Sequence, residues 1–147
     1  MVATNMSELN RMLMNQLQAA MSEASSLMLV DMQKETAAFY SQGSPKMYKR
    51  TGTLGSTPKV SPLSVGGTQI SFDAYLDKSR GYRTGTFSMS DILTNAEAHT
   101  AGILCKPKFW AKSEKKKKKT FEKTMKRFNT IGVLTSGGDA PGMNAAI

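Results

Sequence analysis

YKRTGTLGSTPKVSPLSVGGTQISFDAYL, residues 48–76, is the only stretch of the chain that combines turn residues with the alternation of a strand. Gly66-Gly67 is a two-residue connection of the kind that forms a tight hairpin with positive φ, between arms at residues 59–65 and 68–76. Apolar residues alternate with polar ones in the second arm, at Ile70, Phe72, Ala74 and Leu76. This pattern predicts an antiparallel strand with one face on a helix and the other in water.

The first arm of the hairpin contains Pro58 and Pro62. Because proline has no N–H to donate to a ladder, we expect this arm to be an edge strand or to begin late. An open edge is also a surface with which a neighbouring subunit could pair. The loop before the arm carries Lys46, Lys49 and Arg50 close to glycines, which fits either a phosphate or nucleic-acid contact or a solvated loop.

A long amphipathic helix is predicted over residues 7–40, which contain no proline or glycine. Its apolar residues recur at steps of three and four, at Leu9, Leu13, Leu17, Met21, Ala24, Met28 and Met32. Ser7 is expected to cap the helix and Gly43 to end it. An unbroken helix would be about 50 Å long. We therefore expect it to break near Ser25 and Ser26, to project toward another subunit, or merely to cover the sheet.

The residues after the hairpin predict a polar excursion followed by a small helix. Residues 77–86 are polar, basic and glycine-bearing, as in an exposed loop. Apolar spacing over residues 89–99 predicts the helix, and Ser88, Ser90 or Asp91 can cap it.

Few side chains are suited to catalysis or metal binding. Cys105 is the only cysteine, so no internal disulfide can form and a cytoplasmic site of synthesis fits. His99 is the only histidine, and it is interpreted either as a packed or surface residue or as half of a Cys–His nucleophilic pair. No second histidine or cysteine pair completes a metal site. The expectation is no catalytic residue, no metal ligand and no cofactor.

A strongly basic C-terminal helix is predicted over residues 106–128. They contain eleven Lys or Arg and two Glu, an excess that equals the net charge of +9 of the whole chain. Pro107 suits a first helical position, and apolar side chains can share one side of the helix: Phe109 or Trp110, Phe121, Met125 and Phe128. Lys117 and Lys118 interrupt this apolar side. The pattern predicts a helix that is anchored at its two ends and cationic between them.

The lysine run in the middle of this helix is the candidate binding site. It comprises Lys115, Lys116, Lys117, Lys118 and Lys119. Five consecutive lysines can contact the phosphates of DNA or RNA, and a solvated helix face is the alternative. The longest apolar run of the chain, residues 27–30, is far shorter than the roughly 20 residues of a membrane span, so no membrane partner is expected.

These elements together predict an α+β fold. Its parts are a long N-terminal helix, a small antiparallel sheet with a hairpin, a short helix and a basic C-terminal helix. Residues 1–128 are expected to form one domain, because a chain of 147 residues has room for one ordinary core.

The order of these elements resembles a known family, the HK97 gp10-like tail-completion or minor tail proteins of long-tailed bacteriophages. The likeness spans residues 1–128 and rests on the long helix followed by YKRTGTL, SFDAYLD and SMSDIL. It closes with the PKFWAKSEKK entry into the last helix. The resemblance implies a non-catalytic structural protein of a phage or prophage, in a ring at the head–tail junction or in the tail. It also implies a homo-oligomer made in the host cytoplasm and then built into the virion. Its partners would be other tail or head-junction proteins, and passing DNA is a possible contact.

Residues 129–147 have a different character, TIGVLTSGGDAPGMNAAI from residue 130 onward. A β-branched strand, a glycine turn and a helix start form a phosphate-binding device. The segment is similar to the N-terminus of bacterial ATP-dependent 6-phosphofructokinase, in which Gly137 and Gly138 would line the ATP phosphates. The catalytic, magnesium and sugar-phosphate motifs of that family do not follow, so a truncated stump is expected. ATP and magnesium binding belong to the alternative hypothesis of a kinase fragment, beside that of a basic nucleic-acid-binding module.

Overall fold

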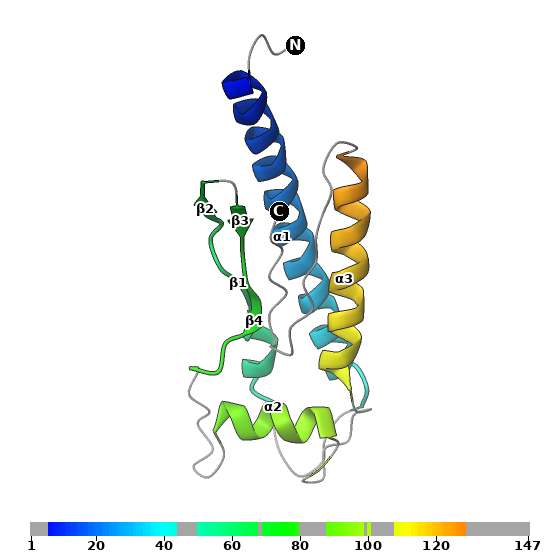
Figure 1. Cartoon of the computed structure of the whole chain (residues 1–147). Helices are drawn as coiled ribbons and strands as arrows, with labels where there is room; N and C mark the ends of the chain where they lie inside the picture. The colour runs from blue at the N-terminus through cyan, green and yellow to red at the C-terminus, as the bar shows by residue number, and fades with distance from the viewer. Residues whose placement is uncertain are drawn as a thin grey trace.

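The computed structural model describes residues 6–43, 50–67, 69–79, 88–98, 100 and 108–128. Its fold is α+β, as predicted, and the described residues form three α-helices, one 3-10 turn and two small antiparallel sheets (Figure 1). In chain order the elements are α1 (Met6–Tyr40), η1 (Thr53–Ser56), β1 (Pro58–Val60), β2 (Ser64–Gly66), β3 (Gln69–Ser71), β4 (Ala74–Leu76), α2 (Met89–Ala98) and α3 (Phe109–Arg127).

Helix α1 runs unbroken for 35 residues. Of the three alternatives for this helix, the break near Ser25 and Ser26 is wrong, because both residues lie within the continuous helix. Their hydroxyls donate to the carbonyl of Ser22, at 2.8 and 3.0 Å. These bonds satisfy the hydroxyls within the helix, which continues past them. The predicted cap is also displaced: the helix begins at Met6, so Ser7 lies in its first turn. Gly43, just past the end of the helix, has the positive φ of 112° expected of a glycine stop.

The strands form one long hairpin whose ladder is interrupted halfway. β1 pairs with β4, and β2 with β3, both antiparallel. The predicted turn is one residue out of register, because Gly66 pairs with Gln69 as the last residue of β2. The connection therefore begins at Gly67, which has φ 55° and needs the freedom of glycine there.

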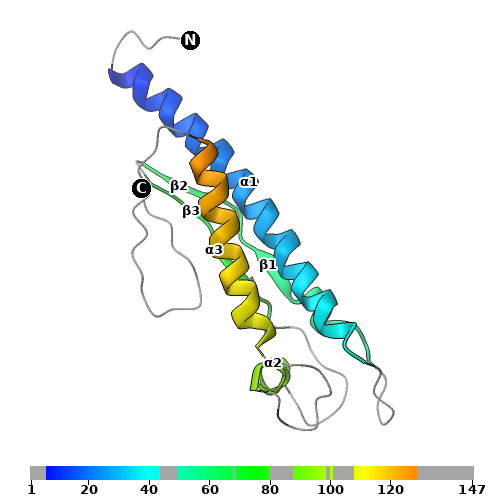
Figure 2. The same ribbon diagram turned by 90° about the vertical axis from the view of Figure 1, so that its right-hand side faces the viewer.

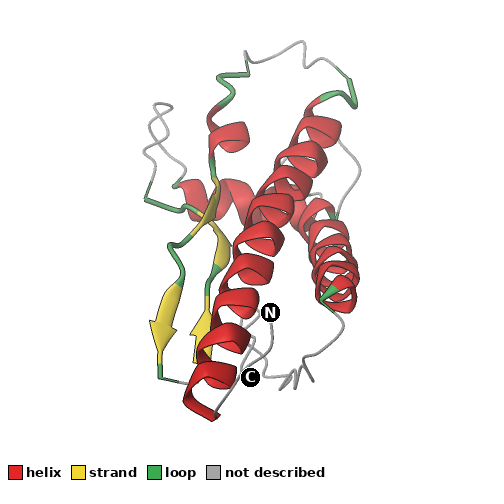
Figure 3. Ribbon diagram, turned by 90° about the horizontal axis from the view of Figure 1, so that it is seen from above, coloured by secondary structure: helices red, strands yellow, loops and turns green. Residues whose placement is uncertain are grey.

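The predicted alternation in the second arm is confirmed. Ile70, Phe72 and Ala74 are buried and Leu76 is half-buried, whereas Asp73 and Tyr75 between them are exposed. The buried side chains of this arm cluster with those of α1, and the view from above shows the strands running beside the long helix (Figure 3). The sheet is thus anchored to the long helix through every second residue.

Pro58 lies at the free edge of the hairpin, which confirms the expectation of an edge strand. The N–H of Asp77 donates to the carbonyl of Thr57 at 2.7 Å, and the N–H of Ser61 donates to Asp73 at 2.8 Å. The backbone N–H and C=O groups of residues 57, 59 and 61 therefore point toward β4. The backbone polar groups of residues 58 and 60 point away from it. The missing N–H of Pro58 costs the ladder no hydrogen bond.

The main core lies where α1, the hairpin and α3 meet (Figure 2). Its buried members are Leu17, Ala20, Met21, Ala24, Met28, Met32, Ile70, Phe72, Ala74, Phe121 and Met125. A second cluster joins the C-terminal end of α1 to η1, α2 and the start of α3, where the rings of Phe39 and Phe109 lie 5.0 Å apart. The predicted apolar side of α3 is confirmed by these contacts. The helix begins at Phe109, and Pro107 lies outside the described residues.

Helix α2 is capped by Ser88, one of the three predicted candidates. The N–H of Asp91 donates to the Ser88 hydroxyl at 3.1 Å, and the hydroxyl and N–H of Ser88 donate to the Asp91 carboxylate at 2.7 and 2.9 Å. This reciprocal arrangement is a capping box with aspartate in the third helical position. It fixes where the polar excursion ends and the helix begins.

The capping box predicts an altered titration of Asp91. The side-chain and backbone hydrogen bonds from Ser88 lower the pKa of this carboxyl from its ordinary value of 3.8. Because the pKa is lowered in the folded state, the contribution to stability is present above the unfolded pKa and is lost as the pH falls through the folded one. In a pH titration followed by NMR, Ser88→Ala is expected to raise the pKa of Asp91 toward 3.8. An unchanged pKa would contradict the capping box.

Candidate interaction site on the lysine-rich helix

The structure distributes the five predicted lysines over three environments. Lys115, Lys118 and Lys119 are exposed, Lys116 is half-buried, and Lys117 is only 1% exposed. Successive residues of a helix are turned by about 100°, so a run of five necessarily covers the whole circumference. The run is therefore not one binding surface.

Lys117 belongs to the core, which corrects the prediction that α3 is anchored only at its ends. Its ammonium lies 3.4 Å from the carbonyl oxygen of Ala74 and 4.2 Å above the ring of Trp110, and it forms an ion pair with Glu114. Ala74 directs its carbonyl away from β1, since the neighbouring residues 73, 75 and 77 face that strand. Lys117 thus satisfies an acceptor on the open edge of β4. Its stem completes the apolar contact between α3 and the hairpin.

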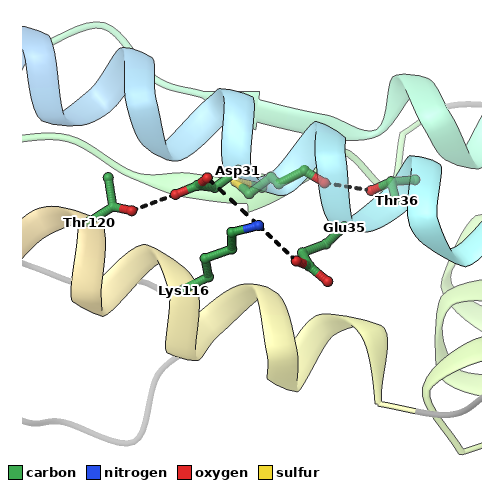
Figure 4. A network of polar contacts seen from close by, with 6 residues as sticks. Asp31, Glu35, Thr36, Lys116 and Thr120 are labelled. Atoms are coloured by element: carbon green, nitrogen blue, oxygen red, sulfur yellow. Dashed lines mark hydrogen bonds and ion pairs between the residues drawn. The ribbon is translucent and has the colours of Figure 1, made fainter.

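Lys116 and Thr120 of α3 face carboxylates of α1 (Figure 4), and Arg127 faces another one. The Lys116 ammonium lies 3.0 Å from Glu35 Oε1 and 4.0 Å from Asp31 Oδ1. The Thr120 hydroxyl donates to Asp31, and farther along the same flank Arg127 pairs with Glu23. The two helices run antiparallel with these pairs in register. One flank of α3 is therefore neutralised by α1.

Five other lysines of α3 point away from the core and form the outward stripe. They are Lys112, Lys115, Lys119, Lys123 and Lys126, and all are exposed. Their spacing of three, four, four and three residues places them on one helical face, opposite Lys117. Within α3, all of whose residues are described, Glu122 is the one exposed carboxylate. This arrangement concentrates positive charge on a single surface.

The N-terminus of α3 is occupied by a carboxylate from α2. Glu97 accepts hydrogen bonds from the N–H groups of Trp110 and Ala111, at 2.8 and 3.2 Å. Lys108, just before the helix, has the positive φ of 66°, and its N–H donates to the carbonyl of Glu97 at 3.1 Å. Sequence reasoning missed this role of Glu97, since a cap from 13 residues upstream leaves no local pattern. The Glu97 carboxylate therefore occupies the positive end of the α3 helix dipole.

An open groove of about 760 Å³ lies where β4, α2 and α3 meet. Its lining includes the side chains of Tyr75, Leu93 and Trp110, together with Lys115. Its single carboxylate, Glu97, is held by the backbone of α3. The groove therefore presents no uncommitted carboxylate for acid–base chemistry among its described lining residues.

Several predicted site residues lie outside the described residues: His99, Cys105, Lys46, Lys49, Gly137 and Gly138. Arg50, the described member of the predicted loop cluster, donates to the carbonyl of Tyr40 and lies over its ring, 5.6 Å from the centroid. It therefore joins the loop to the C-terminal end of α1.

The described part of the chain holds no group of three or more His, Cys, Asp or Glu side chains that could bind a metal ion. Among the helices described, none has the length and apolar character needed to cross a membrane. A scan of the chain against protein-family models found no match, and searches among curated proteins and solved structures likewise found no significant match.

Proposed function

We propose that the chain is a non-catalytic structural subunit that assembles with copies of itself. The particle that fits best is a ring at the head–tail junction or in the tail of a phage or prophage. The subunit would be synthesised in the host cytoplasm and then incorporated into the virion with other tail or head-junction proteins. The proposal is supported by the order of elements described above and by two surfaces at which a second subunit could attach.

The observation that carries the proposal is the projecting end of α1. Arg127, the last residue of α3, pairs with Glu23 of α1. The first turns of α1 extend beyond both α3 and the hairpin (Figures 1 and 2). This extension carries apolar side chains in solvent: Met6 is 71% exposed and Leu9 is 39% exposed. Burial of such side chains against another subunit would be favourable. A helix that served only to cover the sheet would not need this extension.

The second surface is the distal edge of the hairpin. All three residues of β2 are exposed, with Val65 at 53%. Because Gly66 and Gln69 flank the turn as a hydrogen-bonded pair, the N–H and C=O of Val65 point away from β3. They are available to a strand of another subunit. The two surfaces are distinct, and contacts between different surfaces of identical subunits close into rings when the rotation permits.

Sedimentation-velocity ultracentrifugation over a range of concentrations tests the proposal. We expect the full chain to sediment as multimers, and Leu9→Lys to shift the distribution toward monomer by placing a charge on the projecting apolar side. Asn10→Lys is the matched control, since it adds the same charge one residue away at an exposed polar position. A strictly monomeric chain at high concentration would overturn the proposal.

A further inference from the structure

We propose that the outward stripe of α3 binds the phosphate backbone of duplex DNA without regard to base sequence. This goes beyond assembly, because the stripe is separate from both the projecting end of α1 and the edge of β2. It also moves the predicted phosphate contact from the run of five consecutive lysines to the outward stripe. Of the lysine run, only Lys115 and Lys119 belong to the stripe, and they are joined by Lys112, Lys123 and Lys126.

Within the part of the chain that the structure describes, the lysines of the stripe lack paired carboxylates, because the nearby acids contact other groups. Asp31 and Glu35 of α1 contact Lys116, and Glu23 contacts Arg127, all on the flank that faces α1. Glu114 pairs with the buried Lys117. The carboxylate beside the stripe is Glu122, against five lysines. A solvated helix face that served only for solubility would be expected to mix charges of both signs more evenly.

The C-terminal half of the stripe surrounds a surface depression of about 410 Å³. Its lining consists of Lys119, Glu122, Lys123, Lys126 and Arg127. Three lysines of the stripe thus line one hollow, together with Arg127, which pairs with Glu23, and the carboxylate of Glu122. Such a depression can receive a phosphate group and concentrate the positive potential on it.

The length of the stripe suits a duplex. From Lys112 to Lys126 it spans 14 residues, or about 21 Å at roughly 1.5 Å per residue. This corresponds to about six base pairs at about 3.4 Å each. Up to five lysines could therefore lie along one stretch of phosphate backbone at the same time.

The chemistry of the stripe favours duplex DNA over other anionic partners. Single strands are held by aromatic side chains on which bases stack, but Trp110 of α3 and Phe128, just after the helix, are half-buried against the core. Membrane-surface helices need an exposed apolar face, and the apolar face of α3 is buried on α1 and the hairpin. Reading of base edges relies chiefly on Arg, Asn and Gln, and the stripe consists of lysines, which act as point charges on phosphates.

Fluorescence anisotropy with the full chain and short labelled DNA duplexes of two unrelated sequences tests the proposal. We expect equal affinity for both sequences and a linear fall of log K with log salt between about 50 and 200 mM. The slope should be about −0.9 for each phosphate neutralised, reaching about −4.5 if all five lysines engage. The triple variant Lys119→Gln, Lys123→Gln, Lys126→Gln should flatten the slope by about 2.7 and weaken binding.

The matched control removes the same charge from exposed lysines outside the stripe: Lys34→Gln, Lys78→Gln and Lys118→Gln. It should keep a slope close to that of the unmodified chain. Equal slopes for the two triple variants would overturn the proposal, as would absence of binding at 50 mM salt. Equal competition by polyglutamate at the same charge concentration would also overturn it, in favour of an acidic protein partner. Circular dichroism and sedimentation of each variant establish that fold and assembly state are unchanged.

Discussion

Lys117→Ala is expected to lower the free energy of unfolding by about 3 kcal/mol. The side chain is almost fully buried and bridges α3 to the hairpin, so its truncation leaves a cavity between them. The substitution also leaves the Ala74 carbonyl without this donor and removes the cation above the Trp110 ring. Urea unfolding followed by far-ultraviolet circular dichroism measures the change in midpoint.

Two comparisons isolate the cause of this effect. Lys118→Ala removes the same charge from an exposed neighbour and should change stability by less than about 0.5 kcal/mol. Lys117→Met keeps most of the packing volume without the ammonium, so its cost should lie between those of the two alanine variants. If Lys117→Ala were as mild as Lys118→Ala, the buried position of Lys117 would be wrong. The lysine run would then be solvated throughout.

Ile70→Ala is expected to cost a similar amount, about 3 kcal/mol. Ile70 is 0% exposed and belongs to the core shared by α1, the hairpin and α3. Its loss removes buried apolar area and leaves a cavity that the short strand β3 cannot close by moving. The same urea titration measures the effect.

The hairpin supplies its own control for this prediction. Val65 is the direct cross-strand partner of Ile70 and shares its face of the sheet, yet it is 53% exposed. Val65→Ala should therefore change the stability of the monomer by less than about 0.5 kcal/mol. A large loss at Val65, or a small one at Ile70, would mean that β2 rather than β3 faces the helix. The hairpin would then pack on α1 through β2 and expose β3.

Most of the fold was predictable because it depends on local patterns. The unbroken polar-apolar repeat produces α1, the alternation from Ile70 to Ala74 produces the buried side of the hairpin, and Ser88 with Asp91 produces the start of α2. Each of these signals lies within a few residues of the structure that it specifies. The register of the turn at Gly67 differed by one residue, since a neighbouring glycine offers the same freedom and only pairing with the opposite strand selects between them.

The candidate site was predicted less well. Apolar spacing places Lys117 and Lys118 on the apolar side of α3, but the sequence cannot show that Lys117 is buried there and Lys118 is exposed. Lys117 and Lys119 differ only in the direction that the packing of α3 gives them, and that direction depends on Phe121 and Met125 meeting α1 and the hairpin. Glu97, which closes the N-terminus of α3, was not predicted for the same reason.

The α+β class, the elements and their apolar faces could be predicted from the sequence, because helical and strand periodicity, caps and turns are local properties of the chain. The roles of the lysines depend on tertiary packing instead. Packing of α3 against α1 and the open edge of β4 buried Lys117, paired Lys116 with Asp31 and Glu35, and left an outward stripe of five. Burial and pairing depend on groups far away along the chain, since Ala74 is 43 residues from Lys117 and Glu35 is 81 residues from Lys116.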